Sequence, residues 1–159
     1  FAAVLLAAGT FAAFPEVRAN LYNFIIREYE DHTEFNYADQ FSDEYSSADF
    51  TIEPGWLPDG FTLSDEGKVD SLIYKNYENR DLANVSITKR VMSGGPLLVD
   101  SENASETKIT IQQYEATLIE KEEWICLVIP MPQDNKIVYL ESNGVSSDDV
   151  IKVAENLPL

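Results

Sequence analysis

The stretch that decides the fold is Trp124-Ile125-Cys126-Leu127-Val128-Ile129. Successive side chains of a β-strand point to opposite faces of the sheet, so a strand with one face in water alternates apolar and polar residues. Here both alternating sets are apolar, which predicts a strand that is covered on both faces and lies at the centre of a sheet. Residues 137–140, Ile-Val-Tyr-Leu, repeat this pattern and predict a neighbouring strand.

Short segments rich in Ile, Val, Thr and Tyr surround these two strands and predict an antiparallel meander. The expected strands are 71–77, 84–91, 107–112, 114–120, 123–129 and 136–142. Turn chemistry is supplied by Ser93-Gly94-Gly95-Pro96 and by Gln133-Asp134-Asn135.

The end of the chain predicts a helix. Ser146 is a suitable N-cap, and Asp149 follows three residues later. One broad apolar stripe then contains Val150, Ile151, Val153, Ala154 and Leu157. We therefore expect an α+β domain over residues 50–159, in which the antiparallel meander sheet packs against a C-terminal α-helix.

The beginning of the chain predicts a long N-terminal helix over residues 1–30. The first 14 residues carry no charge. A membrane-spanning helix needs ~20 apolar residues, so this stretch fits the end of a longer transmembrane helix. A buried core helix and the remains of a signal peptide are the alternatives. Apolar residues then recur at helical spacing and predict an amphipathic juxtamembrane helix over 15–30, through Val17, Leu21, Phe24 and Ile25.

Residues 31–49 mix acids with spaced aromatic residues. Phe35 and Tyr37 fit the period of a strand, so part of this segment can pair with a sheet. The Ser- and Asp-rich remainder is typical of a connector. We expect an acidic connector between the N-terminal helix and the domain.

Charge restricts the partners. The chain has 11 Lys and Arg against 28 Asp and Glu, a formal net charge of −17. This charge repels phosphate backbones and excludes nucleic-acid binding. Between Arg27 and Lys68 there are 12 acids and no Lys or Arg. Since cytoplasmic flanks of membrane helices collect Lys and Arg, we expect an extracytoplasmic domain on a single-pass cell-membrane protein.

No catalytic, cofactor-binding or metal-ligating residues are assigned, and we expect no enzyme. The single His and single Cys exclude a Cys/His metal cage. His32 lies at the expected end of the first helix, where its charge complements the helix dipole. Cys126 lies in the strand expected to be most buried, where thiols are inert. The acid pairs, which lack calcium-loop spacing and are expected in water, are Asp43-Glu44, Asp65-Glu66 and Glu122-Glu123.

Three stretches together resemble a known family. They are Pro54-Gly55-Trp56-Leu57-Pro58-Asp59-Gly60-Phe61, the strand that starts at Trp124, and the helix over 146–157. Residues 50–157 resemble the bacterial domain of unknown function 4367 family. The resemblance implies a C-terminal extracytoplasmic domain behind one transmembrane helix, in some cases in proteins similar to anti-sigma regulators. It also implies a glycine before Glu115-Ala116, where this chain has Gln113.

The expected function is that of a non-catalytic extracytoplasmic sensory or protein-interaction domain, in the class of sigma-factor regulators. It binds an envelope protein or ligand, is held to the membrane by its N-terminal helix, and self-associates through that helix where it is exposed. Trp56, Pro58 and Phe61 form the candidate interaction surface, although a structural corner that buries the indole explains them as well. The alternative is a carrier of a lipid-like apolar ligand, and a hydrolase would need two carboxylates buried together.

Overall fold

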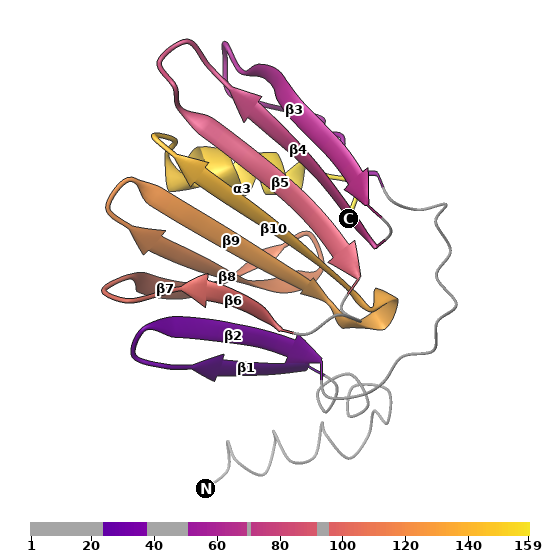
Figure 1. The fold of residues 1–159 in the computed structure, drawn as a ribbon, viewed down its shortest axis with the longest axis vertical. Coiled ribbons are helices and arrows are strands. Elements are labelled where there is room, and N and C mark those ends of the chain that lie inside the picture. The colour runs from indigo at the N-terminus through magenta and orange to yellow at the C-terminus, as the bar shows by residue number, and fades with distance from the viewer. Residues whose placement is uncertain (1–23, 38–50, 70, 92–95) are drawn as a thin grey trace, which may run out of the picture.

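The computed structural model describes residues 24–37, 51–69, 71–91 and 96–159. A seven-stranded antiparallel sheet dominates the fold, with the spatial order β3-β4-β5-β10-β9-β8-β7 (Figure 1). Its strands are β3 Thr62–Val69, β4 Leu72–Glu78, β5 Asn84–Val91, β7 Ser105–Ile111, β8 Tyr114–Lys121, β9 Trp124–Met131 and β10 Lys136–Asn143. A second sheet has the order β1-β2-β6, from β1 Phe24–Glu28, β2 His32–Tyr37 and β6 Leu97–Asp100.

All six predicted strands are present, but the simple meander is wrong at one pairing. Two meanders, β3 to β5 and β7 to β10, join because β10 pairs with β5 as well as with β9. The central strand is therefore β10, and β9 is its neighbour. The predicted turn after β9 is the short 3₁₀ helix η2 Pro132–Asp134, which ends with Asn135 at φ 51°. Strands β3 and β6 were not predicted, because β3 has no regular alternation and β6 is short.

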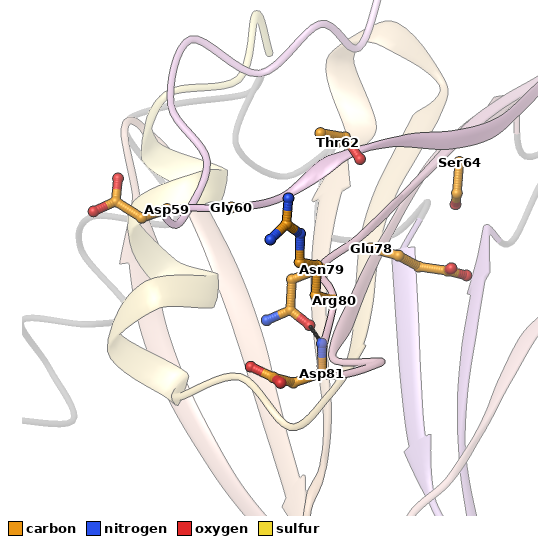
Figure 2. A pocket seen from close by; sticks show the side chains of 8 residues that line it. All are labelled: Asp59, Gly60, Thr62, Ser64, Glu78, Asn79, Arg80 and Asp81. Carbon is orange, nitrogen blue, oxygen red and sulfur yellow. Dashed lines mark hydrogen bonds between the residues drawn. The ribbon is translucent and has the colours of Figure 1, made fainter.

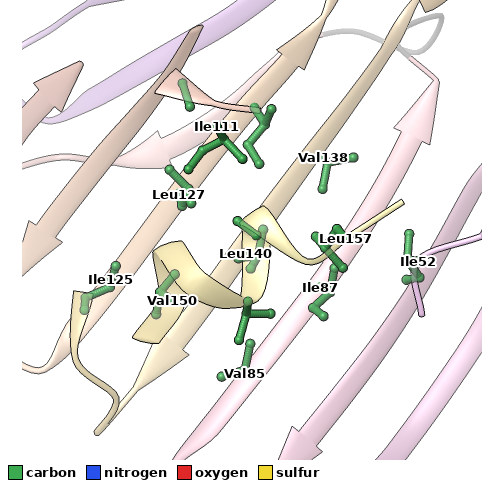
Figure 3. Packing of buried hydrophobic residues seen from close by; sticks show 14 of the residues in the cluster. Ile52, Val85, Ile87, Ile111, Ile125, Leu127, Val138, Leu140, Val150 and Leu157 are labelled. Atoms are coloured by element: carbon green, nitrogen blue, oxygen red, sulfur yellow. The ribbon is translucent and has the colours of Figure 1, made fainter. Parts of the chain in front are cut away.

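The predicted C-terminal helix is confirmed as α3 Ser147–Glu155. The Asp149 backbone N–H donates to Ser146 Oγ at 3.2 Å, as expected of the N-cap. Val150, Val153 and Ala154 of α3 are fully buried. They cover one face of the large sheet, where the buried strand residues include Val85, Ile87, Ile125, Leu127, Ile129, Val138 and Leu140 (Figure 3).

The small sheet covers the opposite face of β9, so this strand is buried on both sides as its sequence predicts. Phe35 and Val99 pack there against Cys126 and Val128. The Thr33 hydroxyl, itself fully buried, donates to Glu106 Oε1 at 2.6 Å and fastens β2 to β7. The molecule thus has a helix, a large sheet and a small sheet in three layers, with the small sheet near the β7–β8 end (Figure 1).

The juxtamembrane helix predicted over 15–30 is wrong at residues 24–28, which form β1. Apolar residues at adjacent positions fit a strand as well as a helix, and pairing with β2 decides between the two. His32 therefore opens a strand and does not end a helix. Its Nδ1 lies 2.7 Å from Asp31 Oδ1, and its ring stacks on Tyr29.

Residues 31–49 contain β2, in agreement with the strand-like spacing of Phe35 and Tyr37. The expected transmembrane end, the rest of the connector and the turn at 93–95 lie outside the described residues. Within the described ranges, no helix is long and apolar enough to cross a bilayer.

Candidate functional site

The Pro- and Gly-rich segment 54–61 is fastened to the end of α3. The Gly55 N–H donates to the Asn156 carbonyl oxygen at 2.8 Å. A Cβ atom at position 55 would lie 3.2 Å from that same oxygen, so the close approach of the two backbones favours glycine. Segment 54–61, which carries part of the family resemblance, is therefore joined near its start to the end of the C-terminal helix by a backbone hydrogen bond.

Trp56 has a structural role in this segment. Its half-buried indole packs against the hydrophobic core between α3 and the large sheet. Lys152 Nζ of α3 lies 3.9 Å from the ring centroid. Such a cation–π contact at a partly exposed site stabilises by about 0.5–1 kcal/mol. One face of the indole is thus already occupied by the chain's own cation.

The second half of the segment turns the chain into β3. The Phe61 N–H donates to the Pro58 carbonyl oxygen at 3.3 Å, and Gly60 has φ +85°, a conformation that favours glycine. Phe61 packs against the core, and Pro58 is half-buried. Of the segment's last residues, Asp59 and Gly60 are the exposed pair, and the sequence did not single them out.

Next to this turn lies the hairpin tip between β4 and β5, residues 79–83. Asn79 Oδ1 accepts hydrogen bonds from the Asp81 N–H at 2.9 Å and from the Ala83 N–H at 3.0 Å. The Asn79 N–H donates to the Ala83 carbonyl at 3.0 Å, and the Leu82 N–H donates to the Asn79 carbonyl at 3.2 Å. These four bonds fix the tip, which includes Leu82 at φ +64°.

The turn and the tip enclose an open depression of about 790 Å³. We call this depression and the tip the corner; its lining residues are Asp59, Gly60, Thr62, Ser64, Glu78, Asn79, Arg80 and Asp81. Figure 2 shows the Arg80 guanidinium in the space between Gly60 and Thr62, with Asp59 and Asp81 at the rim. Three carboxylates and one guanidinium make the corner mainly acidic.

A charged network lies on the strands beside the corner. Lys75 Nζ is 2.6 Å from Glu53 Oε2 and 2.9 Å from Glu66 Oε2. Hydrogen bonds to Glu53 and then to Glu66 raise the pKa of Lys75 far above its ordinary value. The ammonium is therefore kept charged, which is the opposite of what a lysine nucleophile or base needs. The network ties residue 53, just before the family motif, to β3 and β4.

The predicted inertness of Cys126 has a structural basis. Its side chain is 1% exposed, and burial, followed by the charge of Glu141, raises the pKa of the thiol. Burial also raises the pKa of the Glu141 carboxyl, which lies across from Cys126 on β10. A thiol held in its neutral form is a poor nucleophile.

The acid pairs that the structure describes, Asp65-Glu66 and Glu122-Glu123, are exposed as predicted. Asp65 accepts from the Tyr74 hydroxyl at 3.2 Å, whereas Glu66 binds Lys75. Glu122 and Glu123 line a second open depression of about 780 Å³ with Asp100, Lys121, Trp124 and Asn143. Asp43-Glu44 lies outside the described residues. In the described ranges, no group of three or more His, Cys, Asp or Glu could hold a metal ion.

Comparison with known families gives one match. The model of a domain of unknown function, DUF4367, matches residues 51–157. The chain belongs to this family. The DUF4367 match contains the large sheet, α3 and β6, whereas β1 and β2 precede it. The partner of β2 is thus a strand inside the DUF4367 domain. No curated protein and no solved structure matches the chain.

Proposed function

We propose that this chain is a non-catalytic recognition domain of a membrane-anchored bacterial sensor or regulator, and that it binds a protein of the cell envelope at the corner. The observation that carries the proposal is the construction of the corner. The segment before its turn is bonded to the C-cap of α3 through Gly55, and Phe61 packs against the core. Four bonds around Asn79 hold its tip, while its charged groups face water. A rigid scaffold that presents exposed polar loops is the usual arrangement of a binding site.

Charge and family resemblance support an extracytoplasmic place for the domain. The 12 acids between Arg27 and Lys68 are the reverse of a cytoplasmic flank. The resemblance to extracytoplasmic domains behind one transmembrane helix agrees with this placement. A place within a sigma-factor regulator belongs to the same proposal.

A sensory role is supported by the continuity between the small sheet and the domain. The chain enters the small sheet at β1. Phe35 of this sheet is 0% exposed and packs in the hydrophobic cluster that contains Cys126 and Val128 of β9. We propose that the two sheets have a second arrangement besides the one described, and that a partner with different affinity for the two shifts their populations. Such a shift moves the point at which the chain enters β1, and with it the segment leading to the membrane.

The apolar-carrier alternative rested on strands that are apolar on both faces. In the fold, α3 covers one face of β9 and the small sheet covers the other. Packing within the chain therefore explains the pattern, and the two depressions are lined mainly by polar and charged side chains. The carrier role stays a prediction without a separate observation in its favour.

Charge reversal tests the recognition proposal. We expect Asp59→Lys combined with Asp81→Lys to weaken the binding of the envelope partner, co-purified with the full-length protein and measured by quantitative mass spectrometry, at least tenfold. The matched control is Glu122→Lys combined with Glu123→Lys, which changes the charge equally at the second depression and is expected to leave binding intact. Equal effects of the two pairs, or no partner enriched above an unrelated acidic domain, would overturn the proposal.

Placement is tested separately. External protease added to intact cells is expected to degrade the domain, and a cytoplasmic marker protein is expected to survive. Survival of the domain under these conditions would contradict an extracytoplasmic location.

A further inference from the structure

We infer that Leu82 is the apolar anchor of the corner and inserts into an apolar pocket, rimmed by basic side chains, on a partner protein. This inference rests on the proposed recognition function and adds the chemistry of the partner surface. The hairpin tip carries it through three independent observations: the exposure of Leu82, its backbone conformation and the bonds that hold it.

Leu82 is 79% exposed, more than the other exposed large hydrophobic side chains in the described ranges. Those are Tyr29, Leu63, Val69 and Leu98 at 48%, 45%, 65% and 58%. Covering a leucine side chain is favourable because its apolar surface leaves water. The domain itself gains almost none of this free energy from Leu82, so the gain is available to a partner.

The backbone at Leu82 is also unfavourable for a leucine. Its φ of +64° lies in the left-handed region, which Asn, Asp and Gly adopt more readily. Asn103, Asn135, Gly60 and Gly144 follow this preference at other turns, whereas Gln112 and Glu122 share the unfavourable conformation with Leu82. At Leu82 the strained backbone carries a side chain that is largely exposed, and strain of this kind concentrates at functional positions.

The tip is ordered before any partner arrives. Asn79 accepts two hydrogen bonds through its side chain, and its backbone makes two more with Ala83 and Leu82. A pre-ordered loop loses little conformational entropy on binding. The backbone that carries Leu82 is therefore held in one place before binding.

Charges around the tip identify the kind of partner. Glu78, Asp81 and Asp59 surround Arg80 in the depression beside Leu82. An anionic lipid surface, or the same corner of a second copy, would bring like charges together. A protein pocket with a basic rim pairs with the three carboxylates and receives the leucine.

The test uses the full-length protein in its own cells, with a photo-crosslinking amino acid at position 82 or, as a control, at position 98. Leu98 is a matched control because it is also an exposed leucine, on β6. We expect an adduct with one envelope protein from position 82 and none from position 98. No adduct at 82, or the same set of adducts at both positions, would overturn the inference.

Affinity for the identified partner gives the second measurement. Leu82→Asn suits the left-handed conformation, so it removes the anchor without unfolding the tip, and we expect at least a tenfold loss of affinity. Leu98→Thr is expected to leave affinity unchanged. If Asp59→Lys with Asp81→Lys abolishes binding while Leu82→Asn does not, the recognition proposal stands and the anchor is refuted.

Two further results would also refute the partner assigned here. Binding of the wild-type protein, but not of Leu82→Asn, to phosphatidylglycerol vesicles would identify a membrane as the occupant. A dimer in sedimentation that Leu82→Asn dissociates would identify a second copy.

Discussion

The Gln112 side chain is expected to join the β7–β8 hairpin to the end of α3 by two hydrogen bonds. Replacing Gln112 with glycine removes these bonds but also relieves the strain of its left-handed backbone. Gln112 has φ +53°, so its backbone is in the left-handed region. Its side-chain amide donates to the Glu155 carbonyl oxygen at 3.2 Å and to the Leu157 carbonyl oxygen at 2.9 Å. These carbonyls lie at the end of the helix, where intrahelical donors are missing.

The magnitude follows from these contacts. Gln112→Gly relieves about 1 kcal/mol of left-handed strain, but glycine's greater freedom in the unfolded chain offsets about 0.5–1 kcal/mol of that relief. Two lost hydrogen bonds, each with a net contribution of about 0.5–1.5 kcal/mol, then dominate. The variant should unfold with a free energy about 0.5–3 kcal/mol lower than the wild-type protein.

The β8–β9 turn provides a matched control on the same sheet. Glu122 has φ +51°, and its side chain makes no hydrogen bond within the described part of the chain. Glu122→Gly is therefore expected to be neutral or slightly stabilising. Gln112→Glu keeps the side-chain length but removes the donors, so it should destabilise without any change in backbone preference.

Urea denaturation followed by tryptophan fluorescence measures all three variants, since the chain has 2 Trp residues. Equal unfolding free energies for Gln112→Gly and Glu122→Gly, within about 0.3 kcal/mol, would refute the assignment of the Gln112 side chain as a helix-end clamp. Stabilisation by Gln112→Glu would refute it as well.

Three further predictions concern the core, the helix cap and a buried carboxyl. Leu127→Ala removes a side chain that is 0% exposed and should lower the free energy of unfolding by about 2–5 kcal/mol in urea denaturation; a loss below 1 kcal/mol would contradict the packing described for β9. Ser146→Ala removes the N-cap hydroxyl and should cost about 0.5–2 kcal/mol, so an unchanged thermal unfolding curve would count against the cap. Burial raises the pKa of the Glu141 carboxyl above its ordinary value of 4.5. The folded protein therefore binds this proton more tightly than the unfolded chain does. Stability falls as the pH rises from the pKa of the unfolded chain to that of the folded protein. Glu141→Gln should remove this part of the pH dependence and stabilise the protein at neutral pH, and a loss of stability there would show that the carboxylate has a stabilising partner.

The local parts of the fold were predictable because short-range physics decides them. Alternation and β-branched residues located all six expected strands, and the apolar pattern of β9 revealed burial on both of its faces. The spacing of Ser146 and Asp149 located the start of α3, since an N-cap is a contact between residues three apart. At the N-terminal side, Phe24 and Ile25 fitted two periods equally, and the helix inferred there is a strand at 24–28.

The candidate site was predictable only in part. The family motif drew attention to Trp56, Pro58 and Phe61, but contacts with Lys152 and the core give Trp56 and Phe61 structural roles. Asp59, Arg80 and Asp81 line one depression because the hairpin tip lies beside the turn, which no spacing in the sequence encodes. The run from Asn79 to Leu82 contains Asn and Asp, and this composition indicates a turn without indicating what the turn presents.

By itself, the sequence determined which segments are strands, that β9 has no face in water, and where the last helix begins, because each depends on neighbours a few residues apart. Only the tertiary structure decided that β10 joins β5, that β2 and β6 supply the cover over Cys126, and that Leu82 stands exposed beside an acidic depression. The physical reason is that these features depend on contacts between residues far apart in the chain. Many partners have compatible hydrophobicity for such contacts, and the combined packing of both sheets selects one.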